Sequence, residues 1–243
     1  MRLPTERPRW PKDGTVRVGP NPTALPSPRR PDVRAPNRFD DPDAIFAVRY
    51  LADTLRGSLI ELLARFRYND EAEARIRGVE HAEDDDGAHP GPESLTDWFG
   101  LQQVVVSFQL SAPAGSLLVS VNDAGLLADL NDHPRVRAAL DAAVELGVCE
   151  RPELDGGTIR LGGPVGRAIT QAVSRALYEH RPRPDALAYR SRLDDDEHCW
   201  ALYGDTKVTF GEPVPLRPDN EEHRRAVQAA AELFNLALPE EWR

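Results

Sequence analysis

Residues 45–66 constrain the fold most, because two different apolar periodicities follow one another within them. The segment IFAVRYLA at 45–52 is apolar, β-branched and aromatic over the length of one strand. Asp53 or Thr54 can cap a helix after it, because a short side-chain oxygen accepts from a free N–H of the first turn. The segment therefore predicts a strand, a short turn and an amphipathic helix. The apolar residues at helical spacing are Leu55, Leu59, Leu62, Leu63 and Phe66.

Glu61 lies in the middle of this predicted helix. Arg65 follows one turn later, and a Glu–Arg pair at this spacing is a common exposed ion pair. Gly57 and Ser58 lie one turn earlier and leave room on the same side of the helix. Helix physics alone therefore favours an exposed Glu61–Arg65 pair. Tyr50, taken alone, is an ordinary aromatic residue of a strand.

The charge balance restricts the kind of partner. The 243-residue chain is expected to form one large domain, with or without additions, and its 30 basic and 40 acidic residues give a net charge of −10. Nucleic-acid-binding domains present a basic face to phosphates, so direct nucleic-acid binding is not expected. All basic residues except Lys12 and Lys207 are arginines, so an anion site would be built from guanidinium groups.

Cysteine usage predicts the compartment. Cys149 and Cys199 lie far apart without CxxC spacing, which is typical of a reduced cytosolic protein. No basic and apolar leader follows Met1, and no apolar run reaches membrane-spanning length. The chain is therefore expected to be cytoplasmic, without a membrane segment. No His, Cys and acidic residues show metal-ligand spacing, so no metal is expected.

The first 42 residues hold ten of the 22 prolines, which predicts extended, irregular backbone. Within them, residues 15–18 (TVRV) form a short strand candidate. The arm at 1–14 is expected to lie on the domain surface, although PSPRRP at 26–31 could also act as a polyproline ligand. The acidic residues within 80–93 predict a solvated loop.

The rest of the chain alternates short strands and helices, which favours a mixed α+β fold. The breaks at 114–115 and 204–205 are typical of hairpins, and the DDDE run at 194–197 predicts a solvated turn. LGGPVG at 161–166 lacks the Lys and Ser/Thr that close a P-loop, so it predicts a turn into a helix. Strands are expected at 104–110, 116–121, 187–192, 199–203 and 207–210, and helices at 94–99, 124–145 in two pieces, 165–179 and 221–237.

Several motifs follow one another along the chain. Thr-Val-Arg-Val-Gly supplies Arg17 on an opening strand, and RFDDP contains Arg38. The next strand ends in YLA, which begins with Tyr50, and Glu61 follows that Tyr by eleven residues. AYRSR supplies a late Ser191. In this order, the motifs resemble the RES domain family of bacterial toxin–antitoxin systems, and the resemblance covers residues 15–204. Two features depart from the family pattern. RFDDP replaces the commoner G-R-W-N form around the Arg, and the chain is longer than a compact RES toxin.

The resemblance implies an ADP-ribosyltransferase-like fold, with a mixed or antiparallel split β-sheet core and surrounding helices. It also implies a substrate, NAD, whose nicotinamide–ribose bond is cleaved by phosphorolysis, hydrolysis or ADP-ribosyl transfer to a protein. The expected domain spans 15–210, and 211–243 would form a C-terminal helical extension packed on it. The partners implied are NAD and a small Xre-like antitoxin, and a homo-oligomer is left open.

Each predicted site residue has a role in this chemistry. Glu61 would stabilise positive charge developing on the ribose, and Ser191 would hold a ribose hydroxyl or order that carboxylate. Arg38 and Arg17 would bind the pyrophosphate, because a guanidinium fork matches phosphate oxygens. Tyr50 would offer its ring to nicotinamide or ribose. The catalytic set is thus Glu61, Arg38, Tyr50 and Ser191, with Arg17, Arg38, Tyr50 and Ser191 binding NAD. The alternative is a catalytically silent binding or scaffold protein on the same fold.

Overall fold

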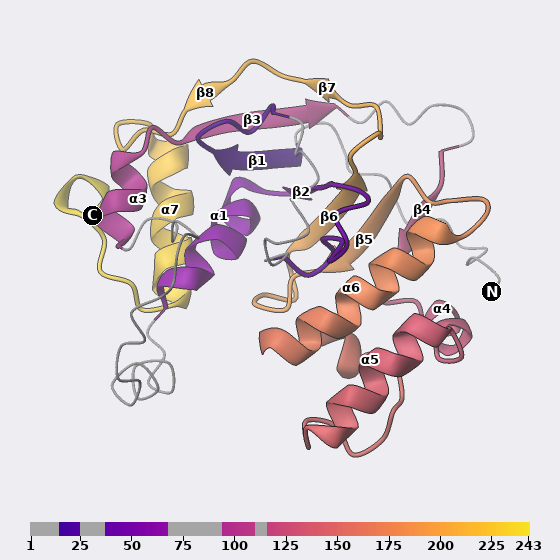
Figure 1. Cartoon of the computed structure of the whole chain (residues 1–243). Coiled ribbons are helices and arrows are strands. Elements are labelled where there is room, and N and C mark those ends of the chain that lie inside the picture. The colour runs from indigo at the N-terminus through magenta and orange to yellow at the C-terminus, as the bar shows by residue number, and fades with distance from the viewer. Residues whose placement is uncertain (1–14, 25–36, 68–93, 110–115) are drawn as a thin grey trace, which may run out of the picture.

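The fold is described from a computed structural model (Figure 1). It describes residues 15–24, 37–67, 94–109 and 116–243. The predicted arm at 1–14, the polyproline motif at 26–31, the acidic loop at 80–93 and the break at 114–115 lie outside these residues.

The described strands form one sheet in the order β4-β5-β6-β2-β1-β3-β7, and β8 also pairs with β3. Neighbouring strands are antiparallel except for β4 and β5, which are parallel. The strands are β1 (Thr15–Gly19), β2 (Val48–Ala52), β3 (Val104–Gln109), β4 (Leu118–Ser120), β5 (Ala186–Arg190), β6 (His198–Tyr203), β7 (Thr209–Phe210) and β8 (Val214–Pro215).

The sheet is nearly divided in its middle. β1 pairs with β3 over five residue pairs, and β2 pairs with β6 over five. A single pair, Val16 with Ala52, joins these two ladders. The predicted α+β class, with a mixed and split sheet, is confirmed.

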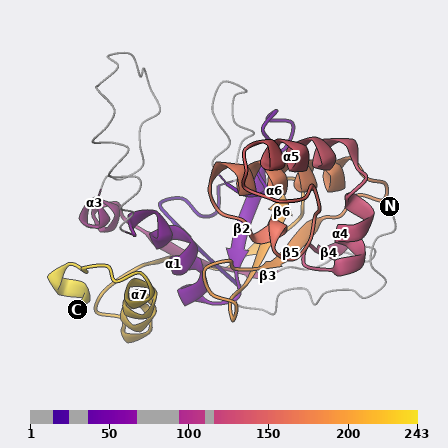
Figure 2. The same cartoon turned by 90° about the horizontal axis from the view of Figure 1, so that it is seen from below.

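The helices form two groups, which Figures 1 and 2 show on separate parts of the sheet. One group contains α4 (Ala124–Leu130), α5 (Pro134–Glu145) and α6 (Gly163–Glu179), and the other contains α1 (Leu55–Leu63), α3 (Leu95–Gly100) and α7 (Glu221–Leu233). Short 3-10 turns, η1 (Ala64–Phe66), η2 (Thr158–Arg160) and η3 (Glu240–Trp242), complete the described elements.

Three buried clusters divide the core between the sheet faces. The first cluster joins α4–α6 to β2, β5 and β6, through residues such as Ile169, Tyr189 and Ala201. The second joins α1 to α7 and β1. The third contains Leu51, Val106 and Trp200, on the opposite face of the sheet. A strand sends successive side chains to opposite faces, so β2 contributes to both sides.

Helix α7 packs directly on α1, the helix that carries Glu61. Leu59, Ile60 and Leu63 of α1 are fully buried, in one cluster with Val227 and Ala230 of α7. Burial of each large aliphatic side chain contributes about 1.5–3 kcal/mol. The C-terminal segment therefore stabilises the position of α1.

The predicted helices at 94–99 and 165–179 correspond to α3 and α6 with small shifts at their ends. The helix expected at 221–237 ends earlier, at Leu233, because Asn235 adopts a left-handed φ of 53°. Both hairpin predictions are wrong. β3 and β4 are not neighbours in the sheet, and β6 and β7 are not neighbours either.

Candidate active site

Glu61 and Ser191, which are 130 residues apart, meet beside the end of β5. Ser191 Oγ donates a hydrogen bond of 2.6 Å to Glu61 Oε1. Ser191 is fully buried, whereas Glu61 is half-buried. Arg65, the alternative partner of Glu61, instead donates from Nε to the Leu62 carbonyl at 3.2 Å.

The Ser191 hydroxyl is held in one orientation. Its oxygen accepts from the Leu193 backbone N–H at 3.1 Å while its hydrogen is given to Glu61. The Ser191 backbone N–H donates to the Glu197 carbonyl at 2.9 Å. With both hydroxyl functions used, Ser191 can order the Glu61 carboxylate.

Glu197 connects the turn after Ser191 to the first turn of α1. Its carboxylate accepts from Thr54 Oγ1 at 2.7 Å and from Arg56 Nη1 at 2.8 Å, and Arg56 Nη2 also donates to Asp194 at 2.6 Å. A Cβ on Gly57 would lie 2.4 Å from Glu197 Oε2, so only glycine leaves room for this carboxylate. The DDDE run was expected to be solvated, but Glu197 is 5% exposed, because Arg56 and Thr54 compensate its burial.

Thr54 also caps α1. Its Oγ1 accepts from the Gly57 N–H at 2.8 Å, so one hydroxyl satisfies the helix end and the buried Glu197. The contact between Thr54 and Glu197 thus joins α1, which carries Glu61, to the turn that follows Ser191, and it fixes both partners of the Glu61–Ser191 hydrogen bond.

Thr54→Ala is expected to lower the free energy of unfolding by about 2 kcal/mol, because it removes a cap and one hydrogen bond to a buried carboxylate. Urea unfolding measures this. Ser94→Ala is the matched control, since Ser94 caps α3 through an exposed hydrogen bond to the Asp97 N–H; its expected cost is about 1 kcal/mol or less. Equal losses in the two variants would show that the Thr54–Glu197 contact adds no stability.

Arg38 presents unused donors near this pair. Its Nη2 donates to the Ile159 carbonyl at 2.7 Å, and its guanidinium lies 5.2 Å from the Phe39 ring centroid and 5.5 Å from that of Tyr189. The buried Nε and Nη1 have no hydrogen-bond partner among the described residues. Buried donors without partners are unfavourable, so this geometry is suited to an anionic ligand.

Tyr50 uses its hydroxyl within the protein. The oxygen accepts from the Phe39 N–H at 2.9 Å, and the hydroxyl donates to Asp40 Oδ1 at 3.0 Å. Burial, reinforced by the Asp40 carboxylate, raises the pKa of Tyr50 well above its usual range. Tyr50 therefore acts as a neutral anchor that holds the segment next to Arg38 against β2.

Arg192 is a candidate that the sequence analysis missed. It directly follows Ser191, and a Cβ on Gly162 would lie 3.2 Å from Arg192 Nη1, at the start of α6. Burial, and after it repulsion by Arg38, lowers the pKa of Arg192, while Glu61 opposes this change. Its position beside the predicted Ser191 was the only signal in the sequence.

The structure does not bring Arg17 to the other predicted residues. Arg17 pairs in register with Val106, which belongs to the cluster on the opposite sheet face. Its Nη1 donates to the Pro22 carbonyl at 3.2 Å. Glu61, Ser191, Arg38 and Tyr50 are therefore assembled on one side of the sheet, and Arg17 lies on the other.

The start of α6 lies near the arginines. The LGGPVG motif begins the helix, as predicted, and Gly163 adopts a left-handed φ of 68°. Gly162 at the N-cap makes no side-chain capping bond. The first backbone N–H groups of a 17-residue helix therefore add partial positive charge close to Arg192.

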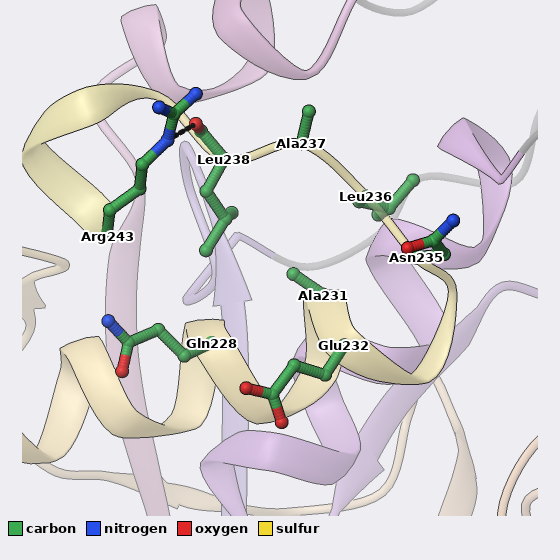
Figure 3. Close-up of a pocket in the computed structure, with 8 residues that line it drawn as sticks. All are labelled: Gln228, Ala231, Glu232, Asn235, Leu236, Ala237, Leu238 and Arg243. Carbon is green, nitrogen blue, oxygen red and sulfur yellow. Dashed lines mark hydrogen bonds between the residues drawn. The ribbon is translucent and has the colours of Figure 1, made fainter.

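A pocket of about 480 Å³ lies elsewhere, at the C-terminal end of α7 (Figure 3). It contains none of the candidate site residues described above, and a hydrogen bond of 2.9 Å from Arg243 Nε to the Leu238 carbonyl joins two of its lining residues. The donors and acceptors of the Glu61 region provide the stronger basis for a site. The pocket is lined by Gln228, Ala231, Glu232, Asn235, Leu236, Ala237, Leu238 and Arg243.

Neither a metal-binding cluster nor a membrane-spanning helix is found in the described part of the chain. No group of three or more His, Cys, Asp or Glu residues in these ranges could hold a metal ion. Among the described helices, none combines the length and apolar character needed to cross a membrane.

Comparisons with known proteins give a family and a distant structural likeness. A family model described as the RES domain matches residues 16–226. A chain in the crystal structure of the M. tuberculosis MbcT-MbcA toxin-antitoxin complex aligns with a TM-score of 0.45 at 10% identity, covering 89% of this chain and 89% of that chain. No curated protein matches this chain significantly.

Proposed function

The chain belongs to the RES domain family, and from this premise we propose that it is an enzyme that cleaves the nicotinamide–ribose bond of NAD. The observation that carries the proposal is the 2.6 Å hydrogen bond between Ser191 and Glu61, with arginines on the same side of the sheet. The enzyme would be a toxin-like NAD-degrading or ADP-ribosylating protein.

The reaction breaks the bond between ribose C1′ and the nicotinamide nitrogen. The bonding electron pair leaves with nicotinamide, so that the cationic ring departs neutral while positive charge builds on the ribose. A carboxylate fixed beside this carbon stabilises the charge as it develops. In this proposal Glu61 supplies that carboxylate, and Ser191 orients it.

The pyrophosphate of NAD would be bound by guanidinium groups. Arg38 has two donors without partners among the described residues, and Arg192 Nη1 lies beside Gly162 at the start of α6. The positive end of the α6 helix dipole adds to this region. Two arginines and a helix end can together match the two phosphates of NAD.

Tyr50 serves in this proposal as a positioning residue, because its hydroxyl anchors the backbone next to Arg38. Its ring lies in the same cluster as Tyr189 and can form part of an apolar wall for nicotinamide. Arg17 has no part here, since it lies on the opposite sheet face.

The acceptor of the ADP-ribosyl group completes the reaction. An oxygen of phosphate or water, or a protein side chain, would form the new bond to C1′ and lose its proton. We further propose, from the family, a cytoplasmic protein controlled by a small Xre-like antitoxin that binds over the Glu61 site.

Nicotinamide release from NAD by the purified protein tests the proposal. We expect turnover by the wild-type protein, and an increase in rate with added phosphate would identify phosphate as the acceptor. Chromatography of the second product distinguishes ADP-ribose from its 1-phosphate. A folded, antitoxin-free protein that binds NAD but releases no nicotinamide, with and without phosphate and protein acceptors, would favour the catalytically silent alternative.

A further inference from the structure

Arg49 is a fully buried arginine without a hydrogen-bond partner. It lies in β2, between Val48 and Tyr50, and its side chain is 0% exposed. Its Nε, Nη1 and Nη2 atoms all lack a partner among the residues that the structure describes. Among the described residues, the Phe210 ring stabilises its charge by a cation–π contact: the ring centroid lies 5.3 Å from the guanidinium carbon.

A second cation, the half-buried Arg17, lies on the neighbouring strand β1. Because Val16 of β1 pairs with Ala52 of β2, Arg17 and Arg49 lie on the same face of neighbouring strands. Burial, and after it repulsion by Arg49, lowers the pKa of Arg17 to about 10. Arg17 gives one hydrogen bond, to the Pro22 carbonyl, and no described Asp or Glu forms an ion pair with either arginine.

Both arginines lie on the face opposite Glu61. Arg49 alternates with Tyr50 along β2, and Arg17 is in register with Val106 of the opposite-face cluster. Trp200, a diagonal neighbour of Arg49 in the β2–β6 ladder, has a buried Nε1–H without a described partner. This face thus gathers the buried donors of Arg49 and Trp200, which lack a partner among the described residues, and Arg17, which gives one hydrogen bond.

An uncompensated pair of like charges in a protein interior is strongly unfavourable, because desolvation and repulsion act together. An oxyanion removes both costs, since it neutralises charge and accepts several hydrogen bonds. A guanidinium fork fits two oxygens of a tetrahedral phosphate, and two cations favour a doubly charged group over chloride. The Phe210 ring that covers Arg49 is itself 37% exposed, so the site lies one side chain below the surface.

We propose that Arg49 and Arg17 form a binding site for phosphate or a phosphate monoester, separate from the Glu61 site and independent of the reaction proposed above. The site is occupied in the stable form of the protein and contributes to its stability.

Thermal unfolding in phosphate and in chloride, at equal ionic strength, tests this site. We expect about 10 mM phosphate to raise the wild-type melting temperature by several degrees, because a ligand of the folded state stabilises it by mass action. Arg49→Met should lose this rise and should melt no lower than wild type in chloride, since Met fills the space without a charge. Arg17→Met is examined in the same way and provides the test if Arg49→Met does not fold.

Phosphate bound near Glu61 is distinguished by Arg192→Met. A rise that persists in Arg192→Met and is absent in Arg49→Met supports the proposal. The reverse pattern, a rise in both variants, or no rise in the wild type would each overturn it. Glycerol 3-phosphate in a parallel series separates the two ligand sources, since a larger rise than with inorganic phosphate identifies a monoester as the ligand.

Discussion

Glu61→Gln is expected to lower the rate of nicotinamide release from NAD by about 10²–10³-fold, because it removes a charge aimed at the developing cation. Gln has the same shape and can still accept the Ser191 hydrogen bond, so the folded structure is retained. The loss should appear mainly in kcat, since the interaction is strongest in the transition state. Steady-state kinetics with NAD measures both parameters.

The control is Glu145→Gln, an exposed Glu to Gln change on helix α5. It should leave the rate unchanged, and both variants should keep the free energy of unfolding within about 1 kcal/mol of wild type. If Glu61→Gln retained half of the wild-type rate, the carboxylate charge would have no catalytic role. The reaction would then have to rest on the arginines alone.

Local sequence patterns predicted the elements of the site because their causes are local. The change from a strand run to helical spacing at 45–66 corresponds to β2 and α1, and Thr54 is the cap. Glu61 itself was ambiguous, since the spacing to Arg65 favours an exposed pair. Only the family motif pointed to a second partner, and the structure supplies it in Ser191.

The arrangement of the strands could not be predicted in the same way. Strand patterns report which residues are extended, but the chain crosses the sheet between β3 and β4 and again between β6 and β7. A short turn sequence favours a hairpin only where the flanking strands pair, and that choice depends on the remainder of the sheet. The sequence also does not give the sheet face of Arg17, which the structure places opposite Glu61.

Local sequence patterns also could not predict which charged residues contact distant parts of the chain. Glu197 belongs to an acidic run that is typical of a solvated turn, yet it is held by Arg56 and Thr54 from α1. Arg192 and Arg49 are likewise ordinary strand-end and strand residues in the sequence. Their significance arises from neighbours more than 100 residues away, such as Glu61 for Arg192 and Phe210 for Arg49.

The LGGPVG motif also shows that local patterns do not reveal tertiary contacts. It gives the second prediction with a large expected effect, on stability. The motif was predicted to be a turn into a helix, and it is one, but its last glycine has a function that the pattern does not reveal. A Cβ on Gly166 would lie 2.0 Å from the Leu161 carbonyl oxygen and 2.4 Å from its carbonyl carbon. These are backbone atoms, which cannot move aside as the end of a flexible side chain can. The loop before α6 therefore packs against the helix at a distance that only glycine permits.

Gly166→Ala is expected to lower the free energy of unfolding by about 3 kcal/mol, because the added methyl group forces the loop and helix apart. For a chain of this size the melting temperature should fall by roughly 6–12 °C, which calorimetry measures. Gly100→Ala is the control, since its Cβ would meet no atom within 4 Å at the end of α3, and it should change stability by less than about 1 kcal/mol. The loop also carries the Ile159 carbonyl that accepts from Arg38, so NAD binding by the folded fraction should weaken as well. A Gly166→Ala protein as stable as Gly100→Ala would show that this close approach is not needed for the fold.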